Sequence, residues 1–161
     1  MLLSAGRLFA ESASEYEVKA AFLLNFTRFV EWDSIDLPPN APLSICILGE
    51  DPFGRTLDDA VQGEQVGEHK ISVQRIKPDD ETTCHLVFVS RSQKDTAKLL
   101  SKFPSGVLTV GEGTEFLKHG GMIAFVLENR RVRFDISMPA VRGAGLRLSS
   151  RLLTVARSVL K

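Results

Sequence analysis

The sequence predicts an α/β fold with a mostly parallel central sheet, an antiparallel hairpin at one edge and helices on both faces. Three observations support this fold class. Short apolar segments alternate with segments of helical periodicity, as in parallel sheets joined by helical crossovers. The segment Leu86–Val89 is continuously apolar, as expected of a strand covered on both faces. Toward the C-terminus, two strand-like segments flank a short polar turn, a pattern typical of a hairpin.

The first expected element is a helix over residues 14–32. Ser14 and Glu17 have the spacing of a capping box. Apolar residues then recur at helical spacing, namely Val18, Ala21, Phe22, Phe26, Phe29 and Val30. Residues 1–14 are predicted to be a flexible N-terminal extension, because their apolar run is too short for a complete signal peptide. This segment fits either a signal-peptide remnant that ends near Ala10 or a disordered cytosolic extension, and residues 15–161 are expected to form one domain.

The remaining elements follow from the alternation of apolar runs with turn residues. Buried strands are expected at residues 43–48, 71–76, 86–89 and 107–110, and the hairpin strands at 122–127 and 132–136. Helices are expected from Pro52, capped by Asp51, to Gly63, from a Ser90 cap to Phe103, over residues 138–142, and from a Ser149 cap through Val159. Thr114 is expected to cap one short turn.

The composition favours no polyanionic partner. The 161 residues carry 20 Lys and Arg against 20 Asp and Glu. This balance gives no electrostatic reason to expect binding to nucleic acid or to an anionic membrane surface. No apolar run approaches the roughly 20 residues that a membrane-spanning helix needs.

The search for catalytic motifs is negative. The chain has no nucleophile elbow, no zinc-protease motif and no glycine-rich nucleotide loop. His69, His85 and His119 are scattered without the spacing of metal ligands. We therefore expect a binding protein without a metal or cofactor, and not an enzyme.

Two regions are candidates for binding a small ligand. In open α/β sheets, ligands bind beyond the carboxyl ends of the strands, which here carry residues 49–51, Ser90 with Arg91, and Gly111 with Glu112. The second region is the C-terminal segment, where Arg147 and Arg151 flank the Ser149 cap. Two guanidinium groups beside a helix N-terminus suit a phosphate or carboxylate. The alternative is that both arginines are solvated charges paired with nearby acids.

Two alternatives remain for the roles of two aromatic residues, and two for the state of the cysteines. Phe29 and Trp32 are of the kind that contribute most to binding at protein interfaces. The alternative for both is core packing. Cys46 and Cys84 permit either one disulfide or two buried thiols.

Six blocks, in order along nearly the whole chain after Glu15, resemble the YfiR family. They are VKAAFLLNF (residues 18–26) with FVEW (29–32), CILGEDPFG (46–54), CHLVFVS (84–90), VLTV (107–110), GGMI (120–123) with VRFDI (132–136), and GLRLSSRLL (145–153). Each block is weak alone, but the ordered set is specific. Ser137 stands where the family often has Asn.

The resemblance implies a periplasmic regulatory protein of a Gram-negative bacterium. The best-known member of the family binds the periplasmic sensing domain of an inner-membrane diguanylate cyclase and holds that enzyme inactive. This action lowers cyclic di-GMP and restrains biofilm formation. The resemblance also implies a homodimer and allows a second hypothesis, a sensor or carrier module for an anionic or aromatic small ligand that acts on another membrane sensor such as a sensor kinase.

The implied periplasmic location bears on the cysteines. In an oxidising compartment, a Cys46–Cys84 disulfide is favoured over two thiols. Relatives can carry a second cysteine pair, which this chain lacks. Redox control that depends on such a second pair is therefore not expected here.

Overall fold

The first helix starts earlier and ends earlier than the sequence predicts. The computed structural model describes residues 2–32 and 37–161, with side chains from residue 14 onward. Helix α1 spans Leu2–Phe29, so the expected extension is helical from Leu2 and Ser14 does not begin the helix. Residues 2–13 contain good helix formers and no proline, which explains the earlier start. In the described part of the chain, no helix is long and apolar enough to cross a membrane.

The central sheet is mostly parallel, as predicted. Its order is β10-β8-β7-β6-β5-β2-β4-β3, and β4, β2, β5, β6 and β7 are parallel neighbours. The strands are β2 (Leu43–Leu48), β3 (Gln65–Val66), β4 (His69–Ile76), β5 (Leu86–Val89), β6 (Leu108–Glu112), β7 (Ile123–Glu128), β8 (Arg131–Ser137) and β10 (Ser158–Leu160). Strands β7 and β8 form the expected antiparallel hairpin, with Asn129 and Arg130 at positive φ in its turn.

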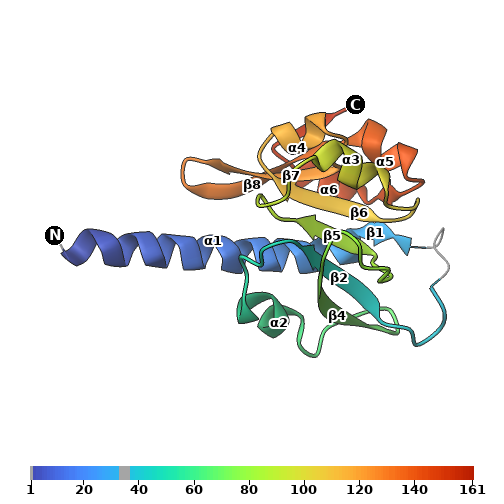
Figure 1. Ribbon diagram of the computed structural model, residues 1–161, viewed down its shortest axis with the longest axis horizontal. Coiled ribbons are helices and arrows are strands. Elements are labelled where there is room, and N and C mark those ends of the chain that lie inside the picture. The colour runs from blue at the N-terminus through green and yellow to red at the C-terminus, as the bar shows by residue number, and fades with distance from the viewer. Residues whose placement is uncertain (1, 33–36) are drawn as a thin grey trace.

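Helices cover both faces of the sheet (Figure 1). The short helices are α2 (Arg55–Val61), α3 (Thr96–Ser101), α4 (Glu115–Lys118), α5 (Met138–Gly143) and α6 (Ser150–Val155). Alternate strand residues face opposite sides. In β2, Ile45 and Ile47 belong to the core shared with α1, α2, α5 and α6, whereas Cys46 and Leu48 belong to the core under α3 and α4.

The predicted final helix is wrong in its second half. Helix α6 ends at Val155 because Ala156 has extended backbone angles, and Val159 then pairs with Ile136 of β8. Arg157 reinforces this pairing, since its guanidinium donates to Asp135 at 2.8 Å. The free edge of β8 therefore outweighs the local helical pattern, and β10, not β8, is the outermost strand.

Two predicted helix caps are also wrong. Helix α2 begins after Gly54, and Asp51 instead accepts a hydrogen bond from the backbone N–H of Phe53 at 2.8 Å. Helix α3 begins after Asp95, and the Ser90 hydroxyl accepts from the N–H of Ser92 at 3.3 Å. In both places the side chain closes a tight turn directly after a strand, a local competitor of helix capping.

Candidate functional site

The point where the strand order reverses lies between β2 and β5, and side chains fill the crevice there. Gly49 has φ +96, and a Cβ built on it would lie 2.5 Å from the Gln93 side-chain nitrogen. The backbone N–H of Glu50 donates to the Ser92 hydroxyl at 3.1 Å. The usual ligand crevice of this fold is therefore occupied by the chain itself, and open space begins one strand further along, between β5 and β6.

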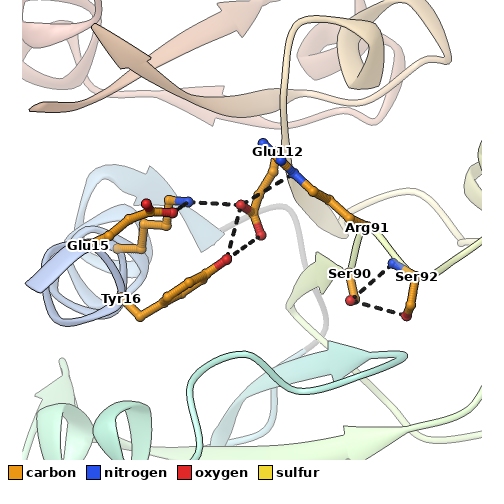
Figure 2. Close-up of polar contacts among 7 residues, drawn as sticks. Glu15, Tyr16, Ser90, Arg91, Ser92 and Glu112 are labelled. Carbon is orange, nitrogen blue, oxygen red and sulfur yellow. Dashed lines mark hydrogen bonds and ion pairs between the residues drawn. The ribbon is translucent and has the colours of Figure 1, made fainter. Parts of the chain in front are cut away.

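A cluster of charged side chains lies at this edge of the sheet. Figure 2 shows Glu112, at the end of β6, surrounded by groups from α1 and from the segment after β5. Lys19 Nζ donates to Glu112 at 2.8 Å and to Glu15 at 2.5 Å. The Tyr16 hydroxyl lies 3.3 Å from both Glu112 carboxylate oxygens, and Arg91 Nε lies 3.5 Å from one of them. The predicted carboxyl-end residues Arg91 and Glu112 are thus brought together.

The central ion pair of this cluster is buried. The Lys19 side chain is 2% exposed and that of Glu112 is 4% exposed. Charges removed from water are tolerated only when they are paired and hydrogen-bonded. Burial and the neighbouring Glu112 carboxylate raise the pKa of Tyr16 to about 12, so its hydroxyl stays protonated and can donate to Glu112.

Lys19 and Tyr16 are not among the residues predicted for this site, because the predicted buried face of the first helix is rotated from the observed one. Val18, predicted on the buried face, is 40% exposed, whereas Lys19 is buried. Lys19 shares its helix face with Leu23, Phe26 and Val30, all buried, at the spacing i, i+4, i+7 and i+11. This apolar stripe, which begins with a lysine, is the sequence feature that could have identified Lys19 as a buried residue.

A cavity of about 410 Å³ adjoins the cluster on the side of α3 and α4. Arg91 and Glu112 line it, together with Ser90, Thr96, Thr114 and Glu115. Phe116 also lines it, and its ring lies so close to two glycines that a Cβ would come within 2.5 Å of it at Gly111 and 2.2 Å at Gly121. The two glycines therefore leave room for the ring, which forms an apolar wall of the cavity.

A second candidate surface is a two-stranded antiparallel ribbon that is separate from the main sheet but packs against the same core. Strand β1 (Val30–Glu31) follows α1 directly and pairs with β9 (Arg147–Leu148), so that Glu31 is opposite Arg147. The backbone N–H of Ser149 donates to the carbonyl of Phe29 at 2.8 Å. The ribbon thereby brings the predicted partner-binding residues close to the predicted ligand-binding arginines, which lie more than a hundred residues away in the sequence.

The aromatic residues of the ribbon are half-buried. Phe29 and Trp32 both pack against the core but retain exposed surface. Trp32 Nε1 donates to the carbonyl of Thr27 at 2.7 Å, and its ring meets the His85 ring edge-on at 6.2 Å. Trp32 is thus held in one orientation while part of its surface faces solvent.

Arg147 and Arg151 are both exposed. Neither forms an ion pair with any carboxylate in the part of the chain that the structure describes. Ser149 is the N-cap of α6, as predicted, and its hydroxyl accepts from the Arg151 N–H at 3.2 Å. Because α6 has only six residues, the two guanidinium groups are the main attraction for an anion at this place.

The disulfide between Cys46 and Cys84 is present, as the resemblance implies. It links the middle of β2 to the residue two positions before β5, inside the core under α3 and α4. The next residue, His85, is 5% exposed, and its Nδ1 accepts a hydrogen bond from the Ser44 N–H at 2.9 Å. Burial lowers the pKa of His85, so the neutral ring is favoured. Among the described residues, no group of three or more His, Cys, Asp and Glu could hold a metal ion.

An apolar groove of about 460 Å³ separates α1 from the β7–β8 hairpin. Figure 1 shows the hairpin projecting beyond the sheet on the same side as the N-terminal half of α1. Val18 and Leu127 line the groove and are 40% and 56% exposed. The groove is a further apolar surface on the described part of the chain.

The comparisons with known proteins agree with this architecture. The crystal structure of a conserved domain protein from Vibrio cholerae O1 biovar El Tor str. N16961 has a similar fold, with a TM-score of 0.50 and 10% sequence identity. The similarity covers 72% of this chain and 54% of that one, so this chain spans about half the length of that relative. A search of the curated proteins finds no significant match. Residues 16–157 match the YfiR/HmsC-like family, and the chain therefore belongs to that family.

Proposed function

We propose that the protein is a periplasmic regulator that binds and represses the periplasmic domain of an inner-membrane diguanylate cyclase. Repression lowers cyclic di-GMP and restrains biofilm formation. Membership of the YfiR/HmsC-like family supports this function. The disulfide supports the location, because disulfides form and persist in oxidising compartments such as the periplasm.

The observation that carries the proposal is the composition of the β1–β9 ribbon. The pairing of β1 with β9 brings the segment that carries Phe29 and Trp32 next to the segment that carries Arg147 and Arg151. Tryptophan and arginine are among the residues most often responsible for binding energy at protein interfaces. The backbone pairing of β1 with β9 fixes both sides of this surface before a partner arrives, which lowers the entropic cost of association.

No catalytic role is assigned to the charged cluster. Its central groups, Lys19 and Glu112, are buried and satisfy each other, and Tyr16 completes the set. A general acid or base needs a proton that can leave and return near the operating pH. The raised pKa of Tyr16 keeps its proton in place near neutral pH. The cluster therefore serves to hold α1 on the edge of the sheet.

The test begins with a pull-down from native membranes, with the purified protein kept oxidised, followed by mass spectrometry. Recovery of a membrane diguanylate cyclase with a periplasmic domain is expected, and addition of the protein should lower the activity of that enzyme. Failure to recover such a cyclase contradicts the repressor proposal. Sedimentation of the same preparation tests the proposed homodimer.

Variants of the ribbon test where the partner binds. Arg147→Glu reverses an exposed charge and should weaken binding at least tenfold. Its melting temperature should fall only slightly, because no ion pair among the described residues is lost but the new carboxylate lies opposite Glu31 in the ribbon. Trp32→Ala should weaken binding similarly. A large loss of stability in Trp32→Ala would assign this ring to the core. Leu160→Ala is the matched control, since Leu160 is apolar and 58% exposed but lies on β10. Equal effects of Leu160→Ala and Arg147→Glu would remove the ribbon from the interface.

A further inference from the structure

We propose that His85 and Trp32 form a pH-dependent switch, in which protonation of His85 displaces the Trp32 ring from its place beside the β1–β9 ribbon. The arrangement in the structure, with Trp32 held in one orientation, is then the state of the neutral His85 ring. The displacement is a property of the chain alone, whereas its effect on the binding of a cyclase rests on the proposed function.

The hydrogen bond of His85 determines which ring nitrogen carries the proton. His85 lies directly before β5 and is 5% exposed. Its Nδ1 accepts a hydrogen bond from the backbone N–H of Ser44 at 2.9 Å. Because Nδ1 is the acceptor, the neutral ring carries its proton on Nε2. Burial disfavours the charged ring and lowers the pKa of His85.

Protonation replaces this hydrogen bond by a conflict between two donors. A proton on Nδ1 would point at the N–H of Ser44, and neither group could then accept. Ser44 cannot turn away, because β2 is paired on both sides. Ser44 lies opposite Ser72 of β4, and its carbonyl accepts from the N–H of His85 at 3.0 Å. The conflict is therefore relieved by movement of the His85 ring and not of the strand.

No negative charge among the described residues holds the protonated ring in place. His69, at the start of β4, is the titratable group whose charge acts on His85, and it opposes protonation. The groups that meet this residue from β2, β6 and the segment after β1 belong to Ser44, Leu108 and Trp32, and none of these titrates. Movement toward water therefore stabilises the charged ring, because water can hydrate it.

Trp32 is the aromatic group in contact with the ring that moves. The two rings meet edge-on, with 6.2 Å between centroids and 83° between planes. A hydrogen bond from Nε1 to the carbonyl of Thr27, at 2.7 Å, holds the indole in the neutral state. Trp32 follows β1 directly, and Glu31 of β1 is exposed and lies opposite Arg147 of β9. Displacement of the indole therefore changes the surface at the end of the ribbon.

Fluorescence of the full chain tests the switch without a partner, because Trp32 is its single tryptophan. As the pH falls from about 7.5 to about 4.5, the emission maximum should move to longer wavelength and quenching by acrylamide should rise at least twofold, with a midpoint below the usual histidine pKa of about 6.5. The far-UV circular dichroism should stay constant. Emission that does not change with pH overturns the proposal, as does loss of the circular dichroism in the same transition. Weaker emission without greater access of acrylamide would mean that His85 is protonated in place against the indole, and also overturns it.

Histidine variants assign the transition to one residue. His85→Asn retains a side-chain oxygen that can accept from the Ser44 N–H but does not titrate, so its emission should not change with pH. His85→Gln serves the same purpose if the shorter side chain prevents folding. His69→Gln should keep the transition and move it to higher pH, because the charge that opposes protonation of His85 is removed. His119→Gln is the matched control and should titrate as the wild-type protein does. A transition that persists in His85→Asn, or is lost in His69→Gln, overturns the proposal.

The partner assay separates this switch from the proposed function. Between about pH 7.5 and about pH 4.5, the wild-type protein should lose at least tenfold more affinity for a recovered cyclase than His85→Asn does, because a smaller fraction of it is competent to bind. If neither protein binds a cyclase at any pH, the proposed function is refuted, and the fluorescence of Trp32 alone decides the switch. Equal losses of affinity in the two proteins refute the effect of the switch on the partner.

Discussion

The buried ion pair between Lys19 and Glu112 makes the sharpest prediction about stability. Lys19→Met removes the ammonium group and keeps an apolar side chain of similar length, so the packing of the lysine stem is largely preserved. Glu112 then remains a 4% exposed carboxylate without its closest partner. The variant therefore isolates the cost of leaving one charge buried.

The expected loss of stability in Lys19→Met depends on the partners that the Glu112 carboxylate keeps. Removal of one partner of a buried ion pair costs about 3–5 kcal/mol. The Tyr16 hydroxyl at 3.3 Å and Arg91 Nε at 3.5 Å still compensate part of the Glu112 charge, so the lower end of that range is expected. For a chain of 161 residues, about 3 kcal/mol corresponds to a fall of about 6–12 °C in melting temperature.

Urea unfolding at neutral pH measures this cost. Lys118→Met is the matched control, because Lys118 pairs with Glu115 at 2.9 Å but both side chains are 71% exposed. An exposed pair of this kind contributes about 0.5 kcal/mol or less. The double variant Lys19→Met with Glu112→Gln should be more stable than Lys19→Met alone, since no unpaired carboxylate remains. A loss below about 1 kcal/mol in Lys19→Met, equal to that of the control, would refute the argument that burial makes this pair important.

Two further predictions concern pH and redox state. The folded pKa of His85 is lowered by burial, so the stability that depends on its neutral ring is present above the unfolded pKa of about 6.5 and is lost as pH falls below it. The urea concentration at the unfolding midpoint should therefore decrease as the pH falls from about 7 to about 5. If His85→Gln shows the same pH dependence as the wild-type protein, this histidine is not its cause. Reduction of the Cys46–Cys84 disulfide, which closes a sequence separation of 38, should cost about 4 kcal/mol on the chain-entropy model. A Cys46→Ala, Cys84→Ala double variant should lose a similar amount and no longer respond to reductant, whereas a wild-type protein equally stable with and without reductant would contradict the estimate.

Elements with a strong local pattern could be predicted from the sequence. Leu43–Leu48 and Leu86–Val89 were predicted with the ends that the structure shows, because each is an apolar run, interrupted only by Ser44 in the first, and each is followed by turn residues. Strands β1, β9 and β10 were not foreseen. They have only two or three residues each, and they exist because a distant segment offers hydrogen-bonding partners. A segment of two or three residues carries no sequence pattern that identifies its pairing partner, whether the partner is the nearby β8 or a strand more than a hundred residues away.

Only part of the charged cluster could be predicted from the sequence, for a related reason. Arg91 and Glu112 follow from the rule that the carboxyl ends of parallel strands meet at one edge of the sheet. Lys19 could not be placed by the same rule, because its position depends on how α1 is rotated against the sheet. The predicted helix face was drawn through apolar residues alone, starting at Val18, and therefore left out Lys19, a residue type that is rarely buried. A buried charge on an apolar stripe is the kind of local conflict that marks a site of specific structural or functional demand.

Helix α1 contacts both the charged cluster and the β1–β9 ribbon. Lys19 reaches Glu112 beside the cavity, whereas Phe29 accepts the hydrogen bond from Ser149 at the ribbon. The ten positions between Lys19 and Phe29 correspond to about 15 Å along the helix axis. A standard interface buries about 800 Å² on each partner and so spans more than this distance. A protein bound at the ribbon is therefore large enough to extend as far as the charged cluster. Comparison of Arg91→Ala with Arg147→Glu in the partner-binding assay therefore measures how far the interface extends along α1: weaker binding in Arg147→Glu alone confines the interface to the ribbon, and weaker binding in both extends it to the cluster.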